Sequence, residues 1–235
     1  MIAVVYSAVM KAVFVRRLAL LAALGLGFAV PFSALAQEKD KAAIPTIASN
    51  PRGVYATINM RTTQEMVARL GAAYGSDHHL AIREVKSDPG AYMPPVLYAL
   101  ANTLAEDHAE EAIFWYHVGR MRAVYDALRC RDKSANGGLL DLRTRINKHL
   151  AFSQFYRRDR LIGIAQKAIE WDLKNPRSYD QRWISLYGKV AASSAGADAG
   201  EILVPESEWP AILKHVHDSH LKSVEDFVAE KSGAK

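Results

Sequence analysis

Cysteine is almost absent from this chain: Cys130 is the only one among 235 residues. A single cysteine excludes an intramolecular disulfide and a zinc site built on paired cysteines. Its thiol could pair with a second chain or act as a reactive group, but we expect a half-buried cysteine on a helix. The fold must therefore be stable through the packing of its side chains alone.

The chain also lacks an apolar run long enough to cross a membrane. Its longest uncharged apolar stretch, from Leu18 to Val30, ends at Pro31, whereas a spanning helix needs about 20 such residues. Three basic residues, Lys11, Arg16 and Arg17, precede this stretch. Small residues follow it at the two positions that a signal peptidase recognises, Ala34 and Ala36. This order is typical of a secretory signal. We predict a signal peptide over residues 1–36, cleaved after Ala36, and a periplasmic or secreted mature protein.

The mature chain has no strong charge of either sign. Residues 1–36 hold three of the 30 basic residues and no acidic one, which leaves 27 basic against 25 acidic residues, a net charge of +2 instead of +5. A nearly neutral chain gives no electrostatic reason to bind nucleic acid. We expect no nucleic-acid partner, no cofactor, and contact with a membrane only through the transient signal peptide.

Helical periodicity dominates the remaining sequence. Residues 37–61 are predicted to be a flexible lead-in, in which Val54–Met60 could form one short strand, and residues 62–235 a single helical domain. Apolar residues at helical spacing, prolines at the start of a helix, and Asn, Asp, Gly or Pro after its end together predict the helices. They are expected over residues 63–73, 78–86, 94–104, 109–129, 139–150, 161–174, 182–190 and 207–230. The fold class is all-α, with antiparallel helical hairpins packed as an irregular bundle or short solenoid of about seven or eight helices.

Two local patterns refine this prediction. Thr62 and Glu65 have the spacing of a capping box, which would start the helix at Thr63. In the helix 109–129, mostly small residues lie on one narrow face, where a neighbouring helix could approach closely: Ala112, Tyr116, Gly119, Ala123 and Ala127.

The segment Leu97–Gly119 resembles a Sel-one-like repeat, a relative of the tetratricopeptide repeat. The resemblance rests on Asp107 followed by Ala112, Trp115, Tyr116 and Gly119, although the Asp-to-Ala spacing is one residue longer and the glycine pair of the turn is missing. Residues 165–176 resemble the second helix of a tetratricopeptide unit more faintly. No regular period of about 34 residues recurs. The resemblance implies a helical hairpin that binds proteins, and it brings no catalytic residues.

A candidate partner-binding face lies on the helix 109–129. Arg122, Asp126 and Arg129 share one side, at a spacing that favours local ion pairs. Trp115 lies off the stripe of small residues, on the arginine side, and is expected to be partly exposed. Exposed tryptophan beside arginine is enriched at interface hot spots. Arg157, Arg158 and Arg160 form a second basic cluster that could bind an acidic partner or phospholipid head groups.

Metal and acid–base chemistry have weaker candidates. His217 and His220 are three residues apart, so they could share one face of a helix and bind one metal ion. Solvent-exposed histidines are the simpler interpretation. Glu170 beside Asp172 is the nearest candidate for a carboxylate pair such as glycoside hydrolases use.

The sequence therefore favours an exported helical module that binds another protein, an envelope scaffold or an immunity-type protein, and we expect no catalysis. The alternative is an exported hydrolase that acts on cell-envelope material through a carboxylate pair or a histidine-bound metal.

Overall fold

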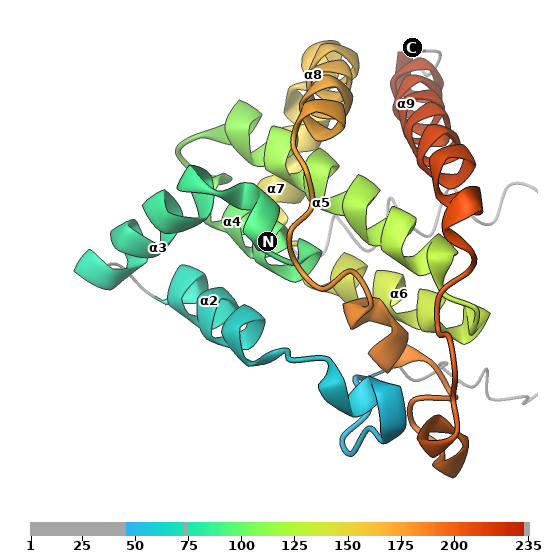
Figure 1. Cartoon of the computed structure of the whole chain (residues 1–235). Helices are drawn as coiled ribbons and strands as arrows, with labels where there is room; N and C mark the ends of the chain where they lie inside the picture. Colours follow the sequence, from blue (N-terminus) through green and yellow to red (C-terminus); the bar gives the residue numbers. More distant parts are fainter. Residues whose placement is uncertain (1–45, 73–74, 233–235) are drawn as a thin grey trace, which may run out of the picture. The chain divides into compact units, whose positions relative to one another are not determined.

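The computed structural model describes residues 46–72 and 75–232, and within these ranges the chain forms eight α-helices and no β-strand (Figure 1). This confirms the predicted all-α class. The helices are α2 (Arg61–Gly71), α3 (Ser76–Ser87), α4 (Pro94–Leu104), α5 (Ala109–Arg129), α6 (Gly137–Thr144), α7 (Lys148–Tyr156), α8 (Leu161–Lys174) and α9 (Trp209–Ser232). The predicted signal peptide and the first residues of the lead-in lie outside the described residues.

Three helices begin and end where the sequence predicts. Pro94 and Pro95 open α4, where the missing N–H groups have no partner to lose. Helix α5 spans the predicted residues, and Asn175-Pro176 follows the end of α8. Proline at the start of a helix and Asn-Pro after its end therefore predict helix boundaries well in this chain.

Four local predictions are wrong. Val54–Met60 is no strand, because Gly53–Thr57 forms a 3-10 helix and places Tyr55 and Ile58, three residues apart, in the core. Thr62 caps no helix, since α2 already begins at Arg61. The predicted helix 139–150 is two helices, because the Asn147 side chain accepts a hydrogen bond from the Leu150 amide and starts α7 anew. Trp183–Tyr187 is a 3-10 helix followed by turns.

Part of the expected lead-in packs on the helical body. The Ala48 amide donates to the Leu186 carbonyl at 2.9 Å, and Tyr55 is only 3% exposed. The packed domain therefore begins before residue 62.

Helix α5 is the centre of the fold. It contacts α4, α6, α7, α8 and α9, and buried residues occupy every side of it (Figure 1). The predicted small-residue face allows α4 to approach α5 closely. A Cβ atom added at Gly119 would lie 3.1 Å from the Leu97 Cβ and 3.1 Å from the Tyr98 ring on α4. Because a central helix must bury its whole circumference, its polar side chains have to find partners inside the protein.

Candidate functional site

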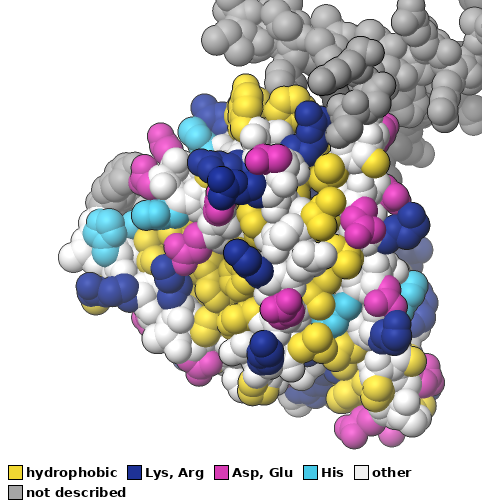
Figure 2. Space-filling view, turned by 90° about the horizontal axis from the view of Figure 1, so that it is seen from above, with side chains coloured by type: hydrophobic (Ala, Val, Ile, Leu, Met, Phe, Trp, Pro, Cys, Tyr) yellow, Lys and Arg dark blue, Asp and Glu magenta, His cyan; other side chains and the backbone are white. Residues whose placement is uncertain are grey.

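A pocket of about 800 Å³ opens between α3 and α4, and we call it the α3–α4 pocket. Its floor is apolar and comes from α2, α3 and α4: Val67, Leu70, Ile82, Pro95, Tyr98 and Ala99. Its rim is polar. On the side of the molecule where α3 lies, yellow hydrophobic side chains are bordered by cyan histidines and by charges of both signs (Figure 2). An apolar floor with a few converging polar groups is the usual composition of a ligand site.

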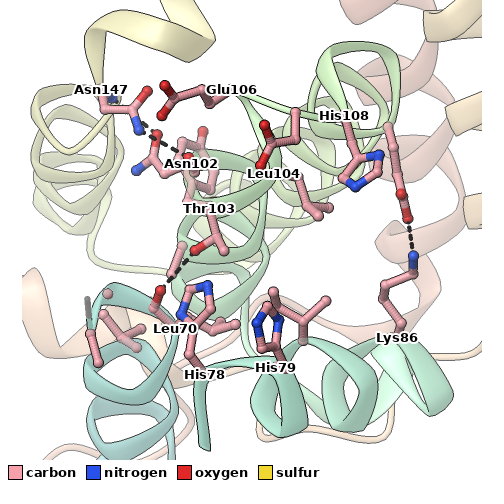
Figure 3. A pocket seen from close by; sticks show the side chains of 18 of the residues that line it. Leu70, His78, His79, Lys86, Asn102, Thr103, Leu104, Glu106, His108 and Asn147 are labelled. Carbon is pink, nitrogen blue, oxygen red and sulfur yellow. Dashed lines mark hydrogen bonds and ion pairs between the residues drawn. The ribbon is translucent and has the colours of Figure 1, made fainter. Parts of the chain in front are cut away.

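Hydrogen bonds between elements hold the walls of the pocket in place. The Thr103 hydroxyl on α4 donates to the Leu70 carbonyl at the end of α2, at 2.8 Å (Figure 3). The Asn102 amide donates to the Arg145 carbonyl at 2.8 Å, and its oxygen accepts from the Asn147 amide at 3.0 Å. The pocket is therefore formed by elements that are fixed to one another before any ligand binds.

Charges of both signs line the pocket, and Arg145 and Glu111 are among them. Arg83 and Lys86 lie on α3, whereas Glu106 and Asp107 lie in the turn between α4 and α5. Lys86 forms an ion pair with Glu111 at 2.5 Å across the end of the pocket. Arg83, Glu106 and Asp107 form no ion pair with any residue that the structure describes, so these three charges are available to a ligand.

Three histidines also line the pocket. His78 and His79 point into it from α3, and His108 faces them from the start of α5 (Figure 3). No three of the described histidine, cysteine, aspartate and glutamate side chains are placed so that they could hold a metal ion. The histidines thus contribute ring faces and hydrogen-bonding groups to the wall of the pocket.

The predicted partner-binding face is not on the surface. Arg122, Asp126 and Arg129 are each 0% exposed, and Trp115 is 6% exposed. The indole of Trp115 packs edge-on against Trp171 with ring centroids 5.3 Å apart. The expectation of an exposed arginine–tryptophan face is therefore wrong, because α5 is surrounded by helices and turns its polar side inward. Trp115 still supports the pocket, since its Nε1 donates to the Glu111 carboxylate at 3.3 Å.

One buried cluster is centred on Asp172. Its carboxylate accepts hydrogen bonds from Arg122 Nε at 2.7 Å, from His217 Nε2 at 2.9 Å and from Arg177. Burial alone would raise the pKa of Asp172, but the hydrogen bond from His217 and the charges of Arg177 and Arg122 outweigh it and lower the pKa. This cluster ties α5, α8 and α9 together and gives both carboxylate oxygens of Asp172 hydrogen-bond donors from the protein itself.

A second buried cluster is centred on Asp126. The carboxylate accepts from Arg129 at 2.8 Å, and from the Tyr179 hydroxyl and the Trp183 indole at 2.9 Å each. Burial raises the pKa of Asp126 to about 6, although Arg129 and the two hydrogen bonds oppose the shift. The Arg129 guanidinium lies 4.1 Å from the centre of the Tyr125 ring and 4.5 Å from that of Trp209. The Asp126 carboxylate therefore has its partners inside the fold, whereas Nε and Nη1 of Arg129 have no hydrogen-bond partner among the described residues.

The two candidate metal ligands serve different clusters. His217 bonds to Asp172, whereas His220 Nε2 lies 3.0 Å from Nδ1 of His117 on α5. Both residues are buried, at 6% and 5% exposure, so the expectation of solvent-exposed histidines is wrong. Burial lowers the pKa of His220 to about 3, helped by Arg120 and His217, and lowers that of His117 well below its usual value. The neutral rings link α9 to α5.

The two carboxylates of the candidate pair, Glu170 and Asp172, also point to different environments. Glu170 is exposed on α8, whereas Asp172 points inward, and neither residue lines the α3–α4 pocket. Sequence reasoning missed the pocket itself. The adjacent histidines 78–79 and the acidic turn 106–107 were visible signals, but nothing in the sequence shows that the two segments face each other.

No protein-family model, curated protein or solved structure matches this chain. The resemblance to Sel-one-like and tetratricopeptide hairpins therefore stays a prediction. Among the described residues, no helix is both long enough and apolar enough to span a bilayer.

Proposed function

We propose that this chain is an exported helical module that binds another protein, and that an extended segment of the partner occupies the α3–α4 pocket. The observation that carries the proposal is the composition of the pocket: an apolar floor bordered by charges of both signs. Peptide segments offer apolar side chains flanked by charges of both signs, and such a segment would match the floor and its charged border at once.

The positions of the shifted titratable groups support binding over catalysis. Catalytic acids and bases combine a perturbed pKa with access to a substrate. Here the carboxyl and imidazole groups that burial perturbs most, Asp126, His117 and His220, lie among α5, α9 and the segment around Tyr179. None of these groups lines the α3–α4 pocket. Their partners are other side chains of the protein, which fits a structural role.

Export is part of the same proposal. The predicted signal peptide would direct the chain to the periplasm or to the medium, where the mature protein begins at Gln37. Amino-terminal sequencing of the protein purified from its natural host checks this start. A protein that retains residues 10–36 would contradict the proposed cleavage.

Photo-crosslinking tests the binding site. A benzoylphenylalanine placed at Asp107 should form an adduct with one protein of the host's envelope extract, and that protein is then purified and titrated by calorimetry. Ala99→Phe fills the floor of the pocket and should weaken binding by at least about tenfold, the effect of about 1.4 kcal/mol. Ala229→Phe, the same change at an exposed position of α9, is the matched control and should have no effect.

Two results would contradict the proposal. One is a partner whose affinity is the same for Ala99→Phe and for Ala229→Phe. The other is release of soluble fragments from purified envelope material by the unmodified protein alone, because that activity would favour the alternative, an exported hydrolase.

A further inference from the structure

Histidines make up half of the buried residues that the structure describes on α9. These residues are Val216, His217, His220 and Val224. The helix runs antiparallel to α5, because Trp209 lies over Arg129 at the end of α5, whereas His220 lies beside His117 nearer its start. The contact between α5 and α9 therefore depends on groups that can change their charge.

The first half of α9 is held by contacts that do not depend on the protonation of its histidine. His217 Nε2 donates to the Asp172 carboxylate at 2.9 Å, and a carboxylate accepts from a ring N–H whether the ring is neutral or protonated. The Trp209 indole donates to the Val204 carbonyl at 3.1 Å, and the Val204 amide donates to the Arg129 carbonyl at 2.8 Å. This half is anchored to α5 and α8.

The second half of α9 depends on one pair of imidazoles. His220 Nε2 lies 3.0 Å from His117 Nδ1, and the two ring centroids are 4.9 Å apart. This hydrogen bond needs one of the two nitrogens without a proton, so two protonated rings cannot form it. Beyond His220, Val224 is the only buried residue among those described on α9. Loss of the pair would thus leave little to hold this half.

The groups that face the pair add positive charge. Arg120 on α5 lowers the pKa of both rings, and His217 on α9 also lowers that of His220. The Tyr116 ring, with its centroid 5.6 Å from that of His117, is the uncharged neighbour on α5. Together with burial, which is the larger cause, these charges bring the pKa of His220 to about 3 and hold that of His117 well below its usual value.

The carboxylates around α9 do not compensate the pair. Those that α9 itself carries are all exposed: Asp218, Glu225, Asp226 and Glu230. Asp172 on α8 accepts from two arginines as well as from His217. Glu206 and Glu208 belong to the short 3-10 helix before α9 and precede its first turn. A proton on either imidazole would therefore be buried beside a cation and without a counter-ion.

We propose that mild acid releases the second half of α9, from His220 onward, from α5, while the first half stays bonded to Asp172 and the other helices stay packed. A released imidazole regains its usual pKa of 6.5. Below that pH the released state therefore binds protons that the docked state does not. Between pH 7 and pH 5, His220 alone should raise the ratio of released to docked protein by about 25-fold, and His117 should add to this.

The other buried carboxylates do not weaken the rest of the fold in this range of pH. The pKa of Asp126 is raised to about 6, so its protonation favours the folded state as the pH falls. The pKa of Asp172 is lowered from 3.8, so its contribution to stability is lost only below about pH 3.8. Acid therefore acts first on the pair that joins α9 to α5.

Amide hydrogen exchange of the full mature protein at pH 7 and pH 5, corrected for the intrinsic rates, tests the proposal. Protection of residues 221–230 should fall by at least about 25-fold between the two pH values. Amides of α4 should remain at least about tenfold better protected than residues 221–230 at pH 5, because the opening is local. Equal protection of the two segments at pH 5 would mean that the whole domain opens, and the proposal would be wrong.

Variants identify the groups that respond. His117→Gln with His220→Gln removes both proton sites, so protection of residues 221–230 should change by less than about threefold between pH 7 and pH 5. His220→Gln alone should reduce the parent's fall by about 25-fold, which gives a second test if the double variant does not fold. His215→Gln, at an exposed histidine of the same helix, is the matched control and should behave like the parent.

Two further results would refute the proposal. One is a parent protein whose protection in residues 221–230 falls by less than about fivefold. The other is a fall of the same size in the parent and in the variants of the pair. No residue of α9 lines the α3–α4 pocket, so Ala99→Phe should leave the acid response unchanged. The response of α9 and the proposed peptide site therefore fail or succeed separately.

Discussion

Replacement of Asp172 by asparagine should destabilise this protein more than most single substitutions do. Asp172 compensates Arg122, and both side chains are 0% exposed. Asparagine keeps the shape of the side chain but removes its charge, so Arg122 would remain buried without a counter-ion. Breaking a buried ion pair in this way costs about 3–5 kcal/mol of the free energy of unfolding. Solvent does not reduce this figure, because neither partner reaches the surface.

The assay is urea unfolding at neutral pH, followed by circular dichroism, together with thermal melting. A loss of about 3–5 kcal/mol in a chain of this size should lower the melting temperature by about 6–20 °C. Asp226→Asn is the control. It removes one carboxylate from an exposed i,i+4 pair with Lys222, whose side chains are 65% and 74% exposed, so its effect should stay below about 1 kcal/mol.

A double substitution separates the ion pair from general damage. Arg122→Met with Asp172→Leu removes both charges and fills their space with apolar atoms, so it should recover part of the stability that Asp172→Asn loses. Recovery should be incomplete, because His217 and Arg177 also lose their acceptor. The reasoning is refuted if Asp172→Asn costs less than about 1 kcal/mol with an unchanged dependence on urea.

Two further predictions concern buried groups. Because burial lowers the pKa of His117 and brings that of His220 to about 3, their neutral forms stabilise the fold fully above pH 6.5, and this contribution is lost as the pH falls from 6.5 toward 3. Between pH 7 and pH 5 His220 should cost about 2 kcal/mol and His117 should add to this loss, opposed by about 1 kcal/mol from Asp126, whose pKa is raised to about 6. Urea unfolding at both pH values should show a smaller loss in His220→Gln than in the parent, and an equal loss would contradict this account. Burial also raises the pKa of the Cys130 thiol to about 12, and the residue is 0% exposed; Ellman's reagent should therefore label it only in denaturant, and an inter-chain disulfide on a non-reducing gel would contradict its burial.

The sequence predicts the helices of this fold better than it predicts which way their faces point. The start of α4 follows from its prolines, the start of α5 from the turn at residues 106–108 and the end of α8 from Asn175-Pro176, and these signals act locally and need no knowledge of neighbours. The direction of a polar side chain does not follow in the same way. Arg122, Asp126 and Arg129 have the spacing of a surface ion-pair ladder, yet α5 buries them, because their partners Asp172, Tyr179 and Trp183 arrive from segments about fifty residues later.

In α7 the sequence also fails to show which way the side chains point, but here aromatic side chains are exposed where polar ones were buried in α5. Phe155 and Tyr156 are large aromatic residues of a short helix, where a buried face would be expected, and their side chains are 51% and 76% exposed. Periodicity shows that one face of a helix is apolar, but it does not show what covers that face. The α3–α4 pocket arises where segments distant in the sequence meet, so no single motif contains it.

Adjacent acids at the start of α5 form ion pairs with two different parts of the fold. From the sequence, Glu110 and Glu111 are explained by the helix dipole, which favours carboxylates near an N-terminus. In the structure each has its own task, because neighbouring residues of a helix point about 100° apart. Glu111 pairs with Lys86 at the end of the α3–α4 pocket, and Glu110 pairs with Arg157 and Arg160 after the end of α7. One turn of the central helix thus binds α3 through one carboxylate and the segment that follows α7 through the other.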